Sequence, residues 1–334
     1  MRPTLSDIAE ASKVSTATVD RVMNARPGVS ARTRALVLAA ARQLGYLPPD
    51  DGPATAMRIE IHLPQGTNAY IGELARQAQE QAASKQMVDV TIVRSGGLDA
   101  QALAEGLLRA ADTADAVAVV ALNHPSVREA IRALDVAGVP VVTLASDIPD
   151  APRKAFIGID NGQAGRLAGF ALGRFLGEAP TGKVALFAGT IGYRGHQERE
   201  MGFRQVLAEE FPALEVLELR ESFEDRKKAF RLTQNLLETH SDLVGVYNAG
   251  GATVGIAAAV EDAQRERLVF VAHEVTPENK AYLLSGTLDA VIDQNARAQI
   301  RQAFEVLTHA IDRKAYRVEP PQLQLILREN LPPS

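Results

Sequence analysis

From residue 58 onward, the chain alternates short apolar runs with longer amphipathic stretches, and this alternation constrains the fold more than any other feature. The runs have the length of buried strands, and the stretches between them have apolar residues at helical spacing. Such an order is typical of βαβ units, whose parallel strands form a sheet with helices on both faces. The expected strands are residues 59–63, 88–93, 116–122, 139–144, 183–188, 214–219, 243–247, 268–272 and 288–292.

These strands are many for one sheet, and residues 156–162 (FIGIDNG) interrupt the alternation. We therefore expect an α/β body, residues 58–330, made of two doubly wound parallel-sheet lobes. Ligands of such sheets bind at the carboxyl ends of the strands, so a ligand cleft is expected between the lobes. The expected lobes are about residues 58–158 plus 295–315 and about residues 159–292 plus 318–330.

Hydrogen-bonding side chains follow most of the expected strands, where they would face this cleft. Such a set suits a polyhydroxylated ligand, whose hydroxyl groups both donate and accept. Asp160 and Asn161 are expected instead to cap a helix that begins near Gln163. His124 and Tyr193 also follow expected strands, and the alternatives for them are a turn residue and an exposed loop aromatic. The candidates for the cleft wall are Asn68, Tyr70, Asn123, Ser146, Asp147, His196, Arg199, Asn248, His273, Glu274, Asp293 and Gln294.

Residues 1–48 have a different pattern, that of three short helices. Thr4, Ser15 and Ser30 each precede a stretch with apolar residues at helical spacing, as N-cap residues do. The third helix is expected to end at Gly45. The first two helices are separated by so few residues that they must cross sharply. The pattern predicts an all-α helix-turn-helix domain, followed by a linker at residues 49–57.

The charge of the chain is divided between these two parts. The whole chain has a net charge of −5 at pH 7, but residues 1–48 carry +4 and the remainder −9. A small basic domain can bind the phosphates of DNA, although a helical bundle with a solvated basic face is the alternative. Arg32 and Arg34, at the start of the third helix, suit phosphate contacts. The second helix would present to base edges the side chains of Thr16, Ala17, Thr18 and Arg21.

The run TLSDIAEASKVSTATVDRVMNARPGVSARTRALVLAAARQLGYLP resembles the DNA-binding head of the lactose-repressor (LacI) family. It follows the family pattern T-x-x-D-[VI]-A-x-x-[AS]-x-V-S-x-x-T-V-x-R-V-[ML]-N, then V-S-x-x-T-R-x-x-V and G-Y-x-P. The resemblance implies that Thr16, Ala17 and Arg21 read bases. It also implies that Asn24 and Ser30 lie near the DNA backbone.

Asp20 and the linker depart from that pattern. Asp20 stands where family members usually have Ser, and a carboxylate there repels phosphate unless it accepts from a cytosine amino group or pairs with Arg21. Asp20 is therefore a candidate specificity residue. The linker is rich in proline and acidic residues and lacks the family's A-R-x-L motif. We expect no hinge helix with a leucine that wedges into the minor groove.

The body resembles the periplasmic sugar-binding (type I) fold that follows such a head. The segments VTLASD, GIDNGQAGRLAG, EREMGF and IDQN carry the resemblance. Two segments depart from it: residues 248–251 (NAGG) replace N-D-x-x-A, and His273-Glu274 stands where relatives have an aromatic residue and Asp. The residues that match sugar-contacting positions of relatives are Asn68, Tyr70, Asp147, Arg199, Asn248, Glu274 and Gln294.

Several classes of protein are excluded by what the sequence lacks. There is no Cys, so a disulfide scaffold and a thiolate metal site are excluded. No apolar stretch is long enough to span a membrane, and the first residues lack the apolar core of a signal peptide, so we expect a cytoplasmic protein. None of the common catalytic motifs is present, and we expect neither a catalytic residue nor a metal or cofactor. A sugar kinase or dehydrogenase with an accessory DNA-binding head is the alternative function.

Together these features predict a transcriptional repressor that binds operator DNA and responds to a small polar effector, such as a sugar, polyol or sugar derivative. Family resemblance implies a homodimer that uses the helices expected at residues 69–83 and 98–111. Two heads in such a dimer would bind a pseudo-palindromic operator.

Overall fold

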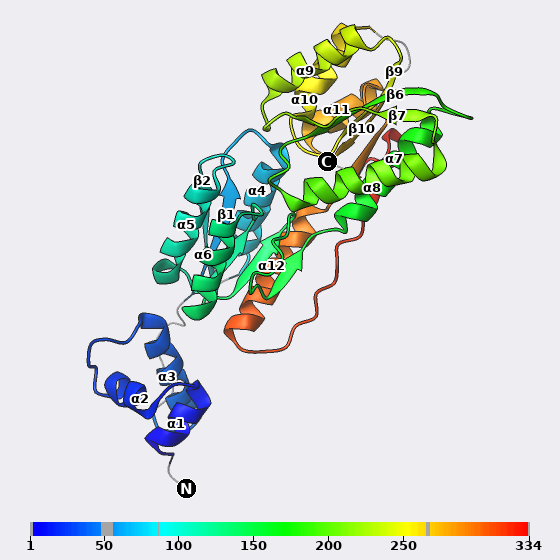
Figure 1. Ribbon diagram of the computed structural model, residues 1–334. Coiled ribbons are helices and arrows are strands. Elements are labelled where there is room, and N and C mark those ends of the chain that lie inside the picture. Colours follow the sequence, from blue (N-terminus) through cyan, green and yellow to red (C-terminus); the bar gives the residue numbers. More distant parts are fainter. Residues whose placement is uncertain (1–2, 48–55, 86, 265–267, 333–334) are drawn as a thin grey trace. The chain divides into compact units, whose positions relative to one another are not determined.

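The computed structural model describes residues 3–47, 56–85, 87–264 and 268–332 (Figure 1). The chain forms two compact units, residues 1–55 and residues 56–334. Nearly all of the linker lies outside the described residues, so the expected absence of a hinge helix stays a prediction. No helix in the described ranges is long and apolar enough to cross a membrane.

The first unit is the predicted helix-turn-helix domain. Each helix begins where its N-cap residue predicts, because the hydroxyl oxygens of Thr4, Ser15 and Ser30 accept hydrogen bonds from backbone N–H groups of the first turn. Lys13 has a left-handed φ of 55°, which makes the tight turn between the first two helices. The helices are α1 (Leu5–Ser12), α2 (Thr16–Met23) and α3 (Ala31–Gln43), and they pack around Ile8, Val19, Val22, Val37 and Ala41.

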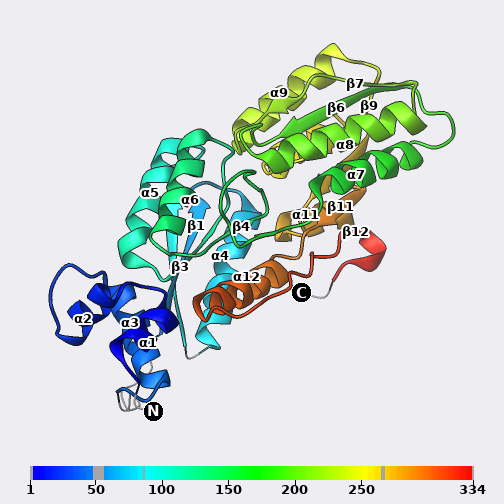
Figure 2. The same ribbon diagram turned by 60° about the horizontal axis from the view of Figure 1, so that its bottom comes forward.

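The first lobe of the second unit is a five-stranded parallel sheet with the order β2-β1-β3-β4-β5. Helices α5 and α6 cover one face, and α4 and α12 cover the other (Figures 1 and 2). The strands are β1 (Met57–Pro64), β2 (Val88–Ser95), β3 (Ala116–Val119), β4 (Val141–Leu144) and β5 (Ala155–Ile157). The helices are α4 (Ala69–Ala83), α5 (Ala100–Thr113), α6 (Pro125–Val136) and α12 (Ala296–Ile311).

The second lobe has a sheet of the order β12-β11-β10-β9-β6-β7, with β8 also paired to β6. Every pair is parallel except β11 with β12. The strands are β6 (Gly182–Ala188), β7 (Leu214–Val216), β8 (Arg220–Glu221), β9 (Leu243–Asn248), β10 (Val269–His273), β11 (Ala290–Asp293) and β12 (Gln324–Ile326). The helices are α7 (Asn161–Phe175), α8 (Arg194–Glu210), α9 (Arg226–Thr239), α10 (Thr253–Asp262), α11 (Pro277–Ser285) and a 3-10 turn at Arg328–Asn330.

The predicted fold class is confirmed: a helical head is followed by two doubly wound lobes. Each of the nine expected runs contains a strand, but β5, β8 and β12 were not expected. These three strands are only two or three residues long and are mostly half-buried or exposed, so they carry no continuous apolar signal. The chain crosses between the lobes after β5, after β11 and again between α12 and β12.

Helices α7 and α8 approach each other closely because glycines face the contact. A Cβ on Gly165 would lie 2.0 Å from the carbonyl oxygen of Arg199, and one on Gly202 would lie 2.1 Å from the carbonyl oxygen of Gly162. Arg199 belongs to α8, so this contact also determines where its side chain enters the space between the lobes.

We expect Gly165→Ala to destabilise the protein by about 1 to 3 kcal/mol, because the added methyl group forces α7 and α8 apart. Gly72→Ala is the matched control: Gly72 lies in α4, and a Cβ there meets no atom within 4 Å. It should be neutral or stabilise by up to about 1 kcal/mol, since Ala favours the helix. Denaturant unfolding of both variants checks this, and equal stabilities would refute the packing argument.

Candidate functional site

Helix α2 exposes the side chains that were predicted to read bases. Thr16, Ala17 and Arg21 are exposed, and within the described part of the head their side chains have no hydrogen-bond partner. Thr18 differs, since it is half-buried and its hydroxyl group lies 2.9 Å from that of Ser15. The free guanidinium of Arg21 is therefore available for an external acceptor.

Asp20 has partners within the head, and Arg21 is not one of them. The amide Nδ2 of Asn24 donates to the Asp20 carboxylate at 2.7 Å, and Nη1 of Arg26 donates to it at 2.9 Å. The proposed pairing of Asp20 with Arg21 is therefore replaced by a pairing with Arg26. These contacts hold the end of α2 and neutralise the carboxylate locally.

The residues predicted to contact phosphate also have structural roles. Arg34 donates from Nη1 to the carbonyl oxygen of Val22 at 3.3 Å and from Nη2 to that of Arg26 at 3.0 Å, so it connects α3 to the end of α2. Ser30 caps α3. The side chain of Arg32 lies outside the described part of the chain, and its predicted phosphate contact stays a prediction.

The two lobes of the body enclose a cavity of about 750 Å³ at the carboxyl ends of their strands. Five of the seven predicted ligand residues line it: Asn68 and Tyr70 from the first lobe, Arg199 and Glu274 from the second, and Gln294 at a crossing. The topology brings these residues together from segments more than 200 residues apart, because the carboxyl ends of both sheets meet here.

Asp147 and Asn248 are not among the described residues that line the cavity. The carboxylate of Asp147 accepts from the Thr143 hydroxyl at 2.8 Å and from Arg153 at 2.5 Å, which holds it within its own lobe. Asn248 is fully buried and donates to the carbonyl oxygen of Gly251 at 2.8 Å. It therefore shapes the glycine loop of the cavity wall rather than facing the cavity.

Arg199 is a buried cation in the cavity wall, with only 5% of its surface exposed. Its Nε donates to Oδ1 of Asn161 at 2.8 Å, and its Nη1 donates to the carbonyl oxygen of Ala249 at 2.8 Å. Asp160 caps α7, as expected, whereas Asn161 orients the guanidinium. Nη2 has no partner among the described residues, so it remains available for a ligand.

Glu274 and Gln294 lie next to each other in the wall, and Nε2 of Gln294 donates to Oε1 of Glu274. Their exposed fractions are 8% and 2%. Burial, together with the neighbouring charge of Asp293, raises the pKa of Glu274 to about 8. Oε2 of Glu274 and Oε1 of Gln294 have no hydrogen-bond partner. The pair therefore presents two unused polar atoms to a ligand: Oε1 of Gln294 is an acceptor, and Oε2 of Glu274 is one when the carboxyl group is ionised.

Glu224 is a cavity residue that the sequence did not indicate. It follows the short strand β8, and both Phe223 and Glu224 have left-handed φ angles, 53° and 60°. Its Oε2 accepts from Nδ2 of Asn68 at 3.2 Å, so it bonds the second lobe to the first. Gly189 and Gly251 leave room for the carboxylate, since a Cβ on either would lie within 2 Å of it. Burial raises the pKa of Glu224.

The histidines and Tyr193 complete the wall, and Tyr193 is buried there, which rules out the alternative of an exposed loop aromatic. Burial lowers the pKa of His196 to about 4, and burial also places the pKa of His273 well below its usual value. Both imidazoles are therefore neutral near pH 7. Nδ1 of His196 lies 2.8 Å from the carbonyl oxygen of Thr190 and donates to it, which leaves Nε2 as an acceptor.

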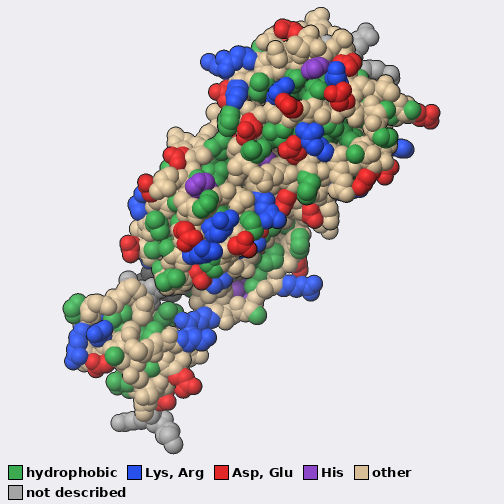
Figure 3. Space-filling view, viewed as in Figure 1, with side chains coloured by type: hydrophobic (Ala, Val, Ile, Leu, Met, Phe, Trp, Pro, Cys, Tyr) green, Lys and Arg blue, Asp and Glu red, His purple; other side chains and the backbone are tan. Residues whose placement is uncertain are grey.

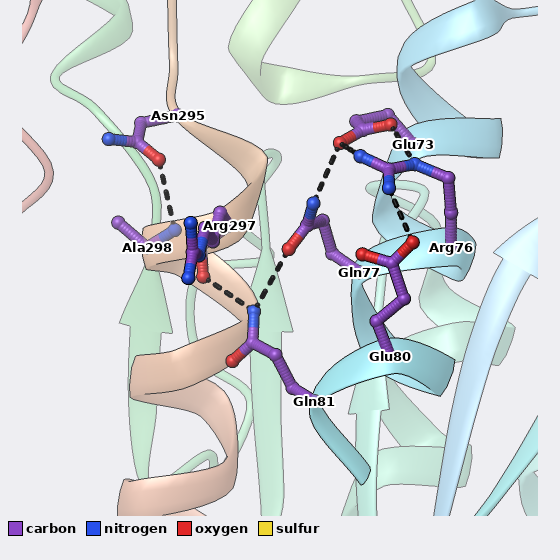
Figure 4. A network of polar contacts seen from close by, with 8 residues as sticks. All are labelled: Glu73, Arg76, Gln77, Glu80, Gln81, Asn295, Arg297 and Ala298. Carbon is purple, nitrogen blue, oxygen red and sulfur yellow. Dashed lines mark hydrogen bonds and ion pairs between the residues drawn. The ribbon is translucent and has the colours of Figure 1, made fainter. Parts of the chain in front are cut away.

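A polar network joins the two helices that carry the first-lobe side of the cavity (Figure 4). Gln81 of α4 donates to the carbonyl oxygen of Arg297 in α12 at 3.0 Å and to Oε1 of Gln77 at 3.2 Å. Arg76 pairs with Glu73 and Glu80 on the same helix. Because Asn68 precedes α4 and Gln294 precedes α12, the network couples two stretches of the cavity wall.

The described residues contain no cluster of three or more His, Asp or Glu side chains that could hold a metal ion. The polar groups of the cavity can bind a ligand through hydrogen bonds and through charge.

Comparison with known proteins assigns both units. Residues 4–49 match the lacI family of bacterial regulatory proteins, and residues 59–315 match the periplasmic binding protein domain. The chain belongs to the lacI family and carries a periplasmic binding protein domain. The family consists of DNA-binding transcription regulators and not of enzymes.

The two units of this lacI-family regulator are similar to different known proteins. The ribose import binding protein RbsB of Escherichia coli K12 is 26% identical over 212 residues, which cover 62% of this chain and 69% of that protein. The regulator MalR of Streptomyces coelicolor is 55% identical over 49 residues, 15% of this chain and 14% of that protein. The crystal structure of GanP, a glucose-galactose binding protein from Geobacillus stearothermophilus, has a TM-score of 0.75 at 24% identity and covers 83% of this chain and 99% of its own.

We expect Glu274→Gln to flatten the dependence of stability on pH. Because the folded-state pKa of about 8 lies above the ordinary value of 4.5, the native protein is most favoured below pH 4.5 and loses stability as the pH rises through 8. The loss approaches about 1.4 kcal/mol per pH unit between pH 4.5 and 8. Melting temperatures between pH 5 and 9 check this, with Glu238→Gln on the exposed face of α9 as control. If the melting temperature of Glu274→Gln changed with pH as steeply as that of the wild type, the prediction would be contradicted.

Proposed function

We propose that this regulator is a cytoplasmic repressor that binds operator DNA through α2 and that a sugar, polyol or sugar derivative in the cavity controls its affinity for DNA. The observation that best supports this proposal is the cavity, which both lobes enclose and line with hydrogen-bonding side chains. Relatives with related bodies include a ribose import binding protein and a glucose-galactose binding protein. Their names support a sugar-like effector.

The head supplies the DNA-binding surface in this proposal. Thr16 and Ala17 are exposed at the start of α2, the end of a recognition helix that meets base edges in the major groove, and Arg21 is exposed in the last turn of the same short helix. On the face of the body shown in Figure 3, Lys and Arg side chains are interspersed with Asp and Glu, so that face offers no continuous basic surface to DNA. The remaining proposed contacts are Thr18, Asp20, Asn24, Ser30, Arg32 and Arg34.

Effector control follows from the position of the cavity between two lobes that the chain crosses repeatedly. A ligand that binds one arrangement of the lobes better shifts the population toward it, and a coupling of about 1 to 3 kcal/mol changes operator affinity about 5- to 150-fold. We propose a homodimer formed through α4 and α5, where Leu108 is exposed. Two heads would then occupy the half-sites of a pseudo-palindrome.

A thermal-shift screen of sugars, polyols and sugar acids, repeated as a measurement of operator release, tests this function. A compound that raises the melting temperature and changes operator affinity supports it. Turnover of a sugar with a nucleotide or nicotinamide cofactor would contradict it.

We expect Arg21→Ala to relax the base preference of the head at a cost of about 1 to 3 kcal/mol in operator binding, because a bidentate contact with a base is lost. Arg132→Ala makes the same change of charge in the body and should leave specificity unaltered. Binding to a set of single-base operator variants measures the effect. An unchanged preference in Arg21→Ala would refute base reading by this residue.

We expect Gln294→Ala to weaken the effector response at least about tenfold, since a hydrogen-bonding group of the wall is lost. Operator binding without effector should stay near the wild-type level. Gln205→Ala, on the exposed face of α8, is the control. Titration of operator release with the effector measures the response, and loss of both functions would show misfolding instead of a lost contact.

A further inference from the structure

Two buried acceptors in the cavity wall have no donor. Oε2 of Glu274 and Oε1 of Gln294 lack a hydrogen-bond partner, and both side chains are more than nine-tenths buried. The hydrogen bond from Gln294 to Glu274 places the amide group of Gln294 beside the carboxyl group of Glu274. Leaving buried acceptors unsatisfied is costly, so a ligand that supplies donors at this point is strongly favoured.

Carboxyl groups outnumber cations around these two atoms. Glu224 and Glu274 belong to the wall, and Asp293 lies close enough to act on Glu274, whereas Arg199 is the buried cation of the described wall. Arg199 already donates to Asn161 and to the carbonyl oxygen of Ala249. At the rim, Arg226 pairs with Glu278, and the Asp225 carboxylate caps α9 near Lys227. With both histidines neutral, the interior has more carboxyl groups than cations, and a positively charged ligand would favour their ionised form.

We propose that the effector is a polyhydroxylated molecule with an ammonium group, an amino sugar or an amino polyol, whose N–H groups donate to Glu274 and Gln294. This inference rests on the proposed function. One ammonium nitrogen offers three donors and a positive charge at a single point, whereas a hydroxyl group offers one donor and no charge. A sugar acid would place a third carboxylate against Glu224 and Glu274. Asn68, Arg199 and His196 remain to bond the hydroxyl groups.

The test compares matched compounds that differ in one group. Isothermal titration calorimetry at pH 7 with the full-length protein would use glucosamine, glucose and glucuronate, and then galactosamine, galactose and galacturonate. We expect one amino sugar to bind at least about tenfold more tightly than its neutral parent, with the acid weakest. In Glu274→Gln, which keeps the oxygen that accepts from Gln294, the preference for the amine should nearly vanish. Glu238→Gln should preserve it.

Each outcome is decisive. If neither amino sugar binds, or each neutral sugar binds as tightly as its amine, the inference is overturned. A preference that survives in Glu274→Gln also overturns it. The proposed function fails separately, when no sugar or polyol of any charge binds and operator affinity responds to none. Neutral sugars that bind and alter operator affinity would therefore preserve the proposed function and remove only this inference.

Discussion

The buried guanidinium of Arg199 is the interaction on which the cavity depends. It enters from α8, is oriented by Asn161 at the start of α7, and reaches the carbonyl oxygen of Ala249 in the glycine loop after β9. Three separate segments of the second lobe thus converge on one cation. This is possible because Gly165 allows the backbone of α7 to meet that of Arg199 directly. A larger residue at that point would displace the cation and the wall together.

The electrostatics of the cavity follow from burial around this cation. The charge of Arg199 opposes the rise in the pKa of both Glu224 and Glu274 and adds to the fall in the pKa of His196 and His273. Burial is nevertheless the larger cause at each of these groups. A ligand that replaces water in this space therefore meets neutral imidazoles and carboxyl groups whose pKa values burial has raised, and only a ligand with a positive charge would shift these carboxyl groups toward the ionised form.

The two units are stabilised in different ways. The head is short, its helices begin at hydroxyl caps, and the chain turns between α1 and α2 at Lys13. Interactions between residues close in sequence therefore account for most of its secondary structure. The body needs long-range pairing, because β12 pairs with β11 only after the chain has passed through α12 of the first lobe and returned. Its site residues accordingly come from distant segments, whereas those of the head lie within a few turns of helix.

The sequence by itself determined the class of both units, the starts of the head helices and several of the polar residues of the cavity wall. Hydroxyl caps and apolar runs act locally, so they are visible in order along the chain, and polar residues after parallel strands must meet at one edge. Only the tertiary structure decided the place of Glu224, which follows a two-residue strand, and the inward roles of Asp147 and Asn248. The direction of a side chain depends on neighbours brought close by folding. Strand order alone carries no information about them.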